Sequence, residues 1–183
     1  MAINFIKKCK PDSYVHSIYD IRYNKLRENG FKYAVFDVDC TILPFDEIMV
    51  SEDIKTLFRY INNLGITSAL CSSSFEGRVK PVADALNVNY MALASKPFVD
   101  FSSIRTLFDY ECSRENTVYI GDSLYLDMYL AGRVKMHKIL VDMITDGNSF
   151  KIYPNEVMNA AIFQGLKKYG LEEKHYFKGF IER

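Results

Sequence analysis

Two kinds of hydrophobic pattern alternate along the chain. Short apolar runs rich in aromatic and β-branched residues predict buried strands at 32–37, 66–71, 89–93, 117–121 and 137–141. Between and after them, apolar residues recur at helical spacing, which predicts helices at 51–65, 76–86, 99–110, 123–132 and 153–170. We therefore expect an α/β, three-layer Rossmann-like fold, with a central parallel sheet of about five strands and helices on both faces.

The boundaries of two helices are marked by single residues. Ser51 before two acidic residues is typical of a helix start, and Gly65 is typical of a helix end. Pro81 predicts a kink, or a later start, in the helix at 76–86.

The chain is predicted to form one domain over residues 1–183, because no linker-like stretch divides it. Within this domain we expect a helical N-terminal extension at 1–30 and a C-terminal helix and tail at 145–183. Apolar residues make up 49% and charged residues 25%, a balance that is typical of a folded, soluble protein.

Charge and cysteine usage narrow the possible partners and location. Lys plus Arg equals Asp plus Glu, 23 each, so no overall field favours nucleic acid as a partner. The four cysteines have no metal-like spacing, and no apolar run approaches the roughly 18 residues of a membrane span. The expected location is the cytoplasm, with the inner face of the membrane as a peripheral alternative.

Polar residues follow four successive predicted strands. Their order is Asp37, Asp39 and Thr41, then Ser72, then Lys96, then Asp122 with Asp127 five residues later. Each residue alone has an ordinary interpretation as a helix cap, a loop residue or a solvated surface group. Together they are expected to meet, because ligands bind beyond the carboxyl ends of parallel strands.

This set of side chains suits phosphoryl transfer. Converging carboxylates repel one another unless a cation lies among them, and an oxygen-only ligand set favours Mg²⁺ over zinc. A lysine and a hydroxyl group would bind the phosphate, and an aspartate can act as a nucleophile.

The ordered motifs resemble those of the haloacid dehalogenase superfamily of phosphohydrolases. They are D-x-D-x-T, a serine, Lys-Pro and G-D-x-x-x-x-D, each after a strand. Finer details, "ILPF", "RVK" and "GDSLYLD", resemble its YqeG or IIIA-type branch, which includes phosphatidylglycerophosphate phosphatases. The resemblance covers roughly residues 11–170 and is strongest over 33–142.

The resemblance implies a role for each motif residue. Asp37 would be the nucleophile and a Mg²⁺ ligand, and Asp39 would be the general acid and base, with its backbone carbonyl reaching the metal. Asp122 would bind Mg²⁺ with Asp127 in support. Three further residues complete the set: Ser72 and Lys96 would hold the phosphoryl group, and Thr41 would orient the first loop.

Two positions depart from the pattern of the branch. Cys40 stands where Asn is usual, and Ser72, Ser73 and Ser74 stand where Ser-Asn-Asn is usual. These changes alter hydrogen-bond donors near the phosphate and leave the charged groups in place. Ser73 is the alternative to Ser72 as the motif serine. Cys40 and Cys71 are interpreted as packing thiols rather than a redox switch.

The spacing of the motifs predicts an open site. About ten residues separate Thr41 from Ser51, and 97–116 holds one helix, so no cap domain is expected. An open site suits a substrate whose bulk stays outside, such as a lipid headgroup, unless a second copy of the chain covers it in a homo-oligomer.

The ends of the chain are basic and aromatic. Residues 1–10 are interpreted as a segment that packs on the domain, with a weak membrane anchor as the alternative, and residues 175–183 as a docking, dimer or membrane contact. The three histidines show no ligand spacing.

The leading functional hypothesis is a Mg²⁺-dependent phosphomonoester hydrolase that works through an aspartyl-phosphate, with phosphatidylglycerophosphate as the substrate at the level of the family. One alternative is a phosphatase for a soluble metabolite, nucleotide or phosphoprotein. The other is a binding or scaffold protein that has the fold and has lost turnover.

Overall fold

The computed structural model describes residues 2–45, 47–144 and 156–172. Its strands are β1 Ser13–Val15, β2 Tyr33–Phe36, β3 Thr67–Cys71, β4 Asn89–Met91, β5 Thr117–Gly121 and β6 His137–Val141. Its helices are α1 Ile3–Cys9, α2 Tyr23–Glu28, α3 Glu52–Asn63, α4 Glu76–Leu86, α5 Phe101–Arg105, α6 Tyr129–Val134 and α7 Glu156–Lys168. A 3₁₀-helix, η1 Ile18–Asp20, and a π-helix, η2 Leu124–Met128, complete the elements.

The six strands form one sheet in the order β1-β6-β5-β2-β3-β4, and every pair is parallel. The predicted sheet of about five strands therefore lacked one member, and residues 1–30 are not purely helical. The missing strand is β1, which pairs with β6 so that Tyr14 lies opposite Leu140. It escaped prediction because it has three residues, all of them half-buried, and no apolar run.

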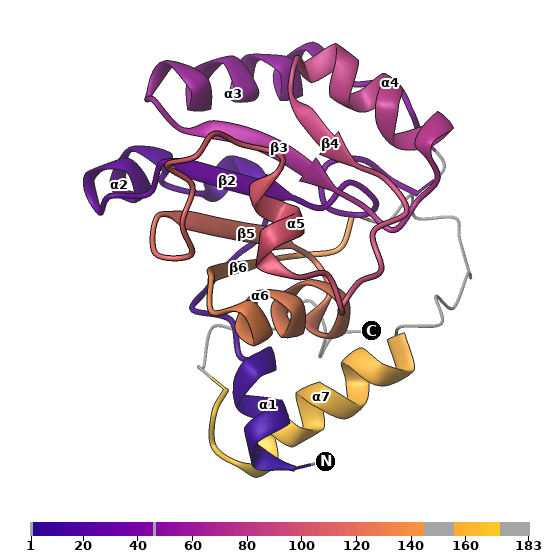
Figure 1. Ribbon diagram of the computed structural model, residues 1–183. Helices are drawn as coiled ribbons and strands as arrows, with labels where there is room; N and C mark the ends of the chain where they lie inside the picture. The colour runs from indigo at the N-terminus through magenta and orange to yellow at the C-terminus, as the bar shows by residue number, and fades with distance from the viewer. Residues whose placement is uncertain (1, 46, 145–155, 173–183) are drawn as a thin grey trace.

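Side chains of the central strands alternate between the two faces of the sheet. On β2, Ala34 and Phe36 belong to the hydrophobic cluster under α3 and α4, whereas Tyr33 and Val35 belong to the cluster under α5 and α6. Figure 1 shows these two pairs of helices on opposite sides of the sheet. The expected three-layer α/β fold is thus confirmed.

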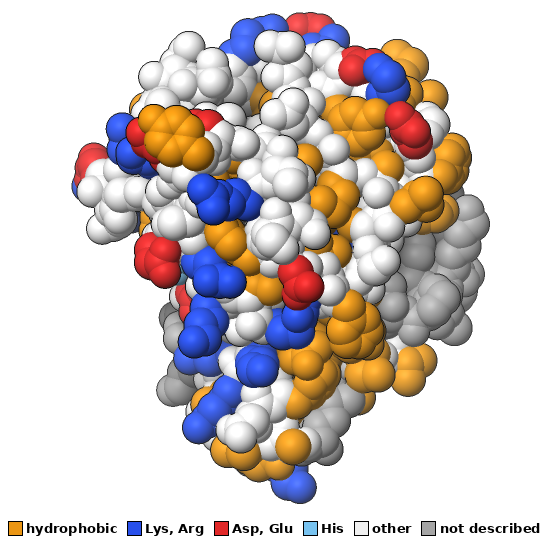
Figure 2. Space-filling view, in the orientation of Figure 1, with side chains coloured by type: hydrophobic (Ala, Val, Ile, Leu, Met, Phe, Trp, Pro, Cys, Tyr) orange, Lys and Arg blue, Asp and Glu red, His pale blue; other side chains and the backbone are white. Residues whose placement is uncertain are grey.

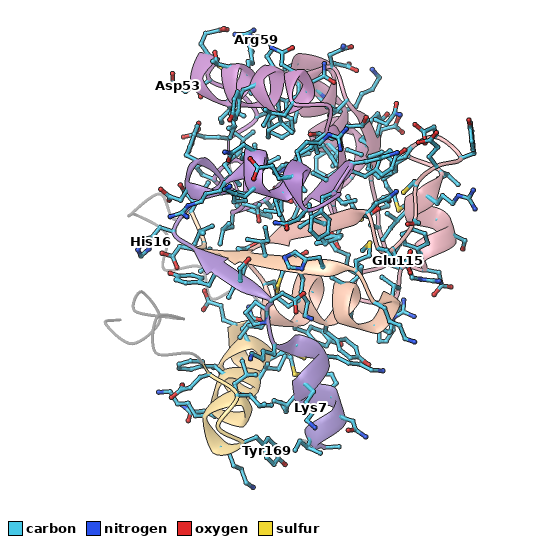
Figure 3. The ribbon with its side chains drawn as sticks, turned by 90° about the vertical axis from the view of Figure 1, so that its left-hand side faces the viewer. Lys7, His16, Asp53, Arg59, Glu115 and Tyr169 are labelled. Atoms are coloured by element: carbon cyan, nitrogen blue, oxygen red, sulfur yellow. The ribbon has the colours of Figure 1, made fainter. Side chains whose placement is uncertain are left out.

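A third hydrophobic cluster joins α1 and α7 to the domain. Ile6 and Cys9 of α1 are completely buried, together with Ile162 and Leu166 of α7. A β-carbon on Gly132 of α6 would lie 2.0 Å from the backbone oxygen of Lys8, so the two helix backbones touch at this glycine. Figure 3 shows Lys7 and Tyr169 at the same end of the molecule. The N-terminal segment therefore packs on the domain.

The connections between strands agree with the absence of a cap domain. The described residues between Phe36 and Glu52 form turns and extended chain, followed by α3, whose N-terminus is capped where Ile54 N–H donates to Ser51 Oγ at 3.3 Å. Pro81 lies inside α4, which begins at Glu76 and not later. The helix expected at 99–110 is shorter, as α5. None of the described helices is long and apolar enough to span a bilayer.

Candidate active site

A cavity of about 190 Å³ lies beyond the carboxyl ends of the central strands. Because β2 to β5 run parallel, the residues that follow them arrive at one edge of the sheet. Of the predicted site residues, Asp37, Asp39, Lys96 and Asp122 line this cavity. Its other lining residues are Cys40, Phe45, Ser73, Ser74, Ser123, Leu126, Met143, Glu156 and Asn159.

Three aspartates converge at the base of the site. One carboxylate oxygen from each of Asp37, Asp122 and Asp127 lies within 4.8 Å of the other two. Asp127 is completely buried on η2, where its Oδ2 accepts a hydrogen bond from Ser123 N–H at 3.0 Å. Gly121 makes room for it, since a β-carbon there would lie 2.4 Å from Asp127 Cγ.

Lys96 supplies the positive charge for this group. Its Nζ lies 2.7 Å from Asp37 Oδ1 and 2.8 Å from Asp127 Oδ1, and its side chain is 1% exposed. The sequence predicted that Lys96 and Asp37 would meet at the strand ends. The second contact, with Asp127, means that a single ammonium group faces three carboxylates.

The charges of this group are unbalanced, and the pKa values reflect the imbalance. Burial, and then the charge of Asp127, raises the pKa of Asp37 to about 7 against the opposing effect of Lys96. Burial, followed by Asp127 and Asp37, raises the pKa of Asp122 well above its ordinary value. Burial lowers the pKa of Lys96, but the carboxylates of Asp127 and Asp37 outweigh it and raise the net value. An added cation would relieve this excess of negative charge.

Asp37 is fixed by its own backbone and by its neighbours. Its N–H donates to Ile120 O at 2.9 Å, which continues the pairing of β2 with β5 past the end of the strand. Its Oδ1 accepts from Val38 N–H at 2.7 Å and also binds Lys96. Both of these contacts fall on Oδ1, so Oδ2 is the oxygen oriented by them.

A tight turn follows Asp37 and sends the next two polar side chains in different directions. Cys40 stands at its centre with φ +62°, in the left-handed region, and its N–H donates to Leu43 O at 2.7 Å. Thr41 is buried beyond the turn, and its Oγ1 donates to Asp122 Oδ1 at 3.0 Å. The structure therefore places Thr41 against a carboxylate of the acidic group.

Asp39 lies apart from the three aspartates, on the other side of the turn. Its Oδ1 accepts a hydrogen bond from Arg78 Nε, and its Oδ2 accepts from Ser74 Oγ at 2.5 Å. The side chain of Asp39 is 17% exposed, so it can meet a ligand in the cavity.

The serine loop differs in detail from expectation. Ser72 is completely buried, and its Oγ lies 3.4 Å from Asp39 Oδ2 while accepting from Ser74 N–H at 3.1 Å. Ser73 and Ser74 line the cavity, and Ser72 does not. Ser72 thus orients Asp39 and the loop in this structure, and the serines that line the cavity are the two residues after it.

Sequence reasoning missed two contributions to the site. Arg78 was noted within "RVK" without a role, although it shares the apolar face of α4 with Val79 and Val82, and a charge on such a face is a signal. Helix α7 was not expected at the site, yet Glu156 lines the cavity and Asn159 Oδ1 accepts from Tyr125 N–H at 3.0 Å.

The donor set fits a hard divalent cation. Three carboxylates converge, no His or Cys among the described residues joins them in a candidate metal group, and the excess negative charge needs compensation. Asp37, Asp122 and Asp127 can therefore hold a metal ion, and Asp39 is outside this group.

Comparisons with known proteins show what this chain is similar to. No protein-family model matches the chain. The chain is 28% identical over 160 residues to "Probable phosphatase YqeG" of Bacillus subtilis, a match that spans 87% of this chain and 92% of that protein.

Two solved structures are similar to this chain at low sequence identity. An uncharacterized protein from Listeria monocytogenes is similar with a TM-score of 0.50 and 17% identity, over 75% of this chain and 99% of that one. The cobalt-bound deoxy-D-mannose-octulosonate 8-phosphate phosphatase of Haemophilus influenzae has a TM-score of 0.45 and 14% identity, over 86% and 99% of the two chains.

Proposed function

We propose that this phosphatase of the haloacid dehalogenase superfamily, of the YqeG type, hydrolyses phosphomonoesters in two steps, with Asp37 as the nucleophile and Mg²⁺ as the metal. The observation that supports this most directly is the setting of Asp37. It is a buried carboxylate at a cavity, with Oδ1 held by Lys96 Nζ and Val38 N–H, both at 2.7 Å, and Oδ2 left to react.

In the first step, Asp37 Oδ2 attacks phosphorus, and the bond from phosphorus to the leaving oxygen breaks. Asp39 protonates the leaving oxygen, since its partly exposed carboxyl group reaches the cavity from the opposite side of the turn. The products are an alcohol and a phosphorylated Asp37.

In the second step, Asp39 takes a proton from water, which attacks phosphorus and releases phosphate and the free Asp37 carboxylate. Lys96, with Ser73 and Ser74, would hold the phosphoryl group during both steps, and Ser72 would orient Asp39 from behind the serine loop. Thr41 would keep Asp122 oriented through its 3.0 Å hydrogen bond.

Mg²⁺ would be held by Asp37, Asp122 and Asp127, with the backbone carbonyl of Asp39 as a further ligand, and when bound it supplies positive charge for the phosphate oxygens. The oxygen-only donors support a hard ion of this kind.

The activity is tested by Mg²⁺-dependent hydrolysis of p-nitrophenyl phosphate, combined with acid quenching to trap a protein-bound phosphate. Asp37→Asn should lose both signals, by at least about 10³-fold in rate. Asp53→Asn is the matched control, because Asp53 is exposed at the start of α3 and does not line the cavity. Equal turnover by wild type and Asp37→Asn would end the assignment. Binding of Mg²⁺ and phosphate without a trapped phosphoenzyme would favour the scaffold alternative.

The surroundings of the cavity support a substrate with an apolar part, such as phosphatidylglycerophosphate. Six large apolar side chains are 44% to 82% exposed in the loops that follow β2, β3 and β4, namely Phe45, Ile48, Met49, Phe75, Leu93 and Phe98. Figure 2 shows hydrophobic side chains gathered on its right-hand half, at the end of the sheet toward which β3 and β4 point in Figure 1. Exposed apolar groups around an open site favour an apolar ligand.

The substrate is tested with phosphatidylglycerophosphate in mixed micelles and with glycerol phosphate in solution. The lipid should show the higher kcat/KM. Turnover of the soluble phosphate without hydrolysis of the lipid would instead support the alternative, a phosphatase for soluble phosphomonoesters.

A further inference from the structure

We propose that Arg78 is a positioning residue for Asp39, which fixes the carboxyl group that moves the proton to and from the substrate. This inference rests on the proposed function and extends it to a residue of α4 that contacts neither the acidic group nor Lys96 in the contacts described above. It assigns Arg78 to one chemical event, protonation of the leaving oxygen.

The guanidinium group of Arg78 is buried and held on all sides. The side chain is 7% exposed. Nε donates to Asp39 Oδ1, Nη1 donates to Glu47 O at 2.7 Å, and Nη2 donates to Pro44 O at 2.9 Å. The guanidinium carbon also lies 5.6 Å from the centre of the Phe45 ring. A planar group with three fixed partners cannot turn, so it dictates where its carboxylate partner lies.

The other contacts of Asp39 fix the orientation of its carboxyl group less strictly. Its Oδ2 faces the hydroxyl groups of Ser74, at 2.5 Å, and Ser72, at 3.4 Å. A hydroxyl group rotates and can donate elsewhere, whereas the guanidinium fork has a fixed direction. Without Arg78, the carboxyl group of Asp39 would keep its two serine neighbours and lose the partner that sets its plane.

Arg78 also connects Asp39 to the loop after β2, which contributes Phe45 to the cavity wall. Pro44 and Glu47, whose carbonyls it binds, flank Phe45, and Phe45 lines the cavity. One side chain therefore holds both the proton-transfer group and the wall beside it. A purely structural clamp would explain the two carbonyl contacts, but the contact through Nε is to a carboxylate that faces the cavity.

The two explanations differ in their dependence on the leaving group. An alkyl phosphate must receive a proton as its alcohol leaves, whereas p-nitrophenolate leaves well without one. Misplacing a general acid should therefore reduce hydrolysis of the alkyl ester far more than that of the aryl ester. A general defect in folding or metal binding would reduce both equally.

The experiment compares kcat/KM for hexyl phosphate and p-nitrophenyl phosphate, with Mg²⁺, in wild type, Arg78→Gln, Arg78→Lys and Asp39→Asn. The value of kcat/KM reports the steps up to formation of the phosphoenzyme, so hydrolysis of that shared intermediate does not enter. The ratio of the two values for one preparation does not depend on how much of the protein is folded. Arg27→Gln is the matched control, because Arg27 also binds a backbone carbonyl, that of Leu64, but at the opposite end of β3.

We expect Arg78→Gln to raise the aryl-to-alkyl ratio at least about tenfold, and Asp39→Asn to raise it by about 10²-fold or more. Arg78→Lys keeps the charge without the fork and should also raise the ratio. The double variant that combines Arg78→Gln with Asp39→Asn should show no higher ratio than Asp39→Asn alone, since both changes act on one event.

Three results would overturn the inference. A ratio within about twofold of wild type in Arg78→Gln and Arg78→Lys, with both rates reduced, would make Arg78 a structural clamp. A ratio in the double variant well above that of Asp39→Asn would mean that Arg78 acts through another group. A wild type that hydrolyses neither ester would remove the proposed function, and this inference with it.

Discussion

Asp37 and Asp39 are two residues apart in the sequence, and their surroundings in the structure are opposite. Around Asp37, three carboxylates face one ammonium group, that of Lys96. Around Asp39, one carboxylate faces one guanidinium group, that of Arg78. The first side is short of positive charge and the second is balanced. The first side can therefore accommodate a cation, whereas the second side leaves its carboxyl group for the proton transfer proposed above.

Removing the ammonium group of Lys96 from the Asp37 side, which we call the crowded side, should have the largest effect on stability. Lys96→Met should lower the free energy of unfolding by about 3–5 kcal/mol without metal, because it leaves buried carboxylates uncompensated. Urea unfolding in a chelator measures this loss. Mg²⁺ should raise the stability of Lys96→Met more than that of wild type, as it replaces part of the missing charge.

Arg78→Gln provides the comparison for the Asp39 side, where the charges are balanced. Mg²⁺ should not restore the stability that is lost with the Arg78 guanidinium group. Lys80→Met is the control for a lost charge, because Lys80 pairs with Asp84 at 2.6 Å on the exposed surface of α4, where solvent screens the pair and little change in stability is expected. A loss below about 1 kcal/mol in Lys96→Met would mean that the carboxylates do not depend on this cation.

The crowded side should also make stability depend on pH. The pKa of Asp37 is raised from 3.8 to about 7, chiefly by burial, so the folded protein keeps a proton that the unfolded chain releases at lower pH. This contribution to stability is complete below about pH 4 and is lost as the pH rises through about 7. Relative to Asp37→Asn, metal-free wild type should lose about 2–3 kcal/mol between about pH 5 and about pH 8.

The measurement is urea unfolding of both proteins with a chelator at each pH, so that titrating groups outside the acidic group cancel in the difference. Saturating Mg²⁺ should flatten the dependence, because a bound cation favours the ionised carboxylate. A difference that stays constant or changes in the opposite direction would contradict the raised pKa.

The smallest expected effect concerns the turn that separates the two sides. Cys40 has a positive φ, a conformation that Asn adopts more readily than other residues with a β-carbon. Cys40→Asn, which restores the residue usual in the branch, should raise the free energy of unfolding by about 1 kcal/mol. Thermal unfolding of Cys40→Asn and of Asn87→Ala forms a matched pair. Asn87 ends α4 with φ +53°, so its replacement should destabilise the protein, and the same sign for both variants would refute the argument.

The sequence sufficed for features that parallel topology delivers without further information. Asp37, Lys96 and Asp122 each follow a strand, and any parallel sheet with these strands side by side brings them together. Their residue types then indicate the chemistry.

Features that depend on distant contacts were not predictable in this way. Arg78 owes its place to Asp39 and to two carbonyls more than thirty residues earlier, which no local pattern encodes. β1 exists because β6 offers it an edge. η2 is a π-helix rather than an ordinary α-helix, and its Asp127 turns inward above Gly121. In each case tertiary contacts select the local structure.

The cluster formed by α1 and α7 also constrains the order in which contacts can form while the chain is synthesised. Ile6 is synthesised about 160 residues before Leu166, and both belong to the same hydrophobic cluster. The strands that carry Asp37, Ser72, Lys96 and Asp122 are complete long before that point. A nascent chain can therefore assemble its sheet before α7 is available to cover its part of α1, and the contact between α1 and α7 joins segments far apart in the sequence.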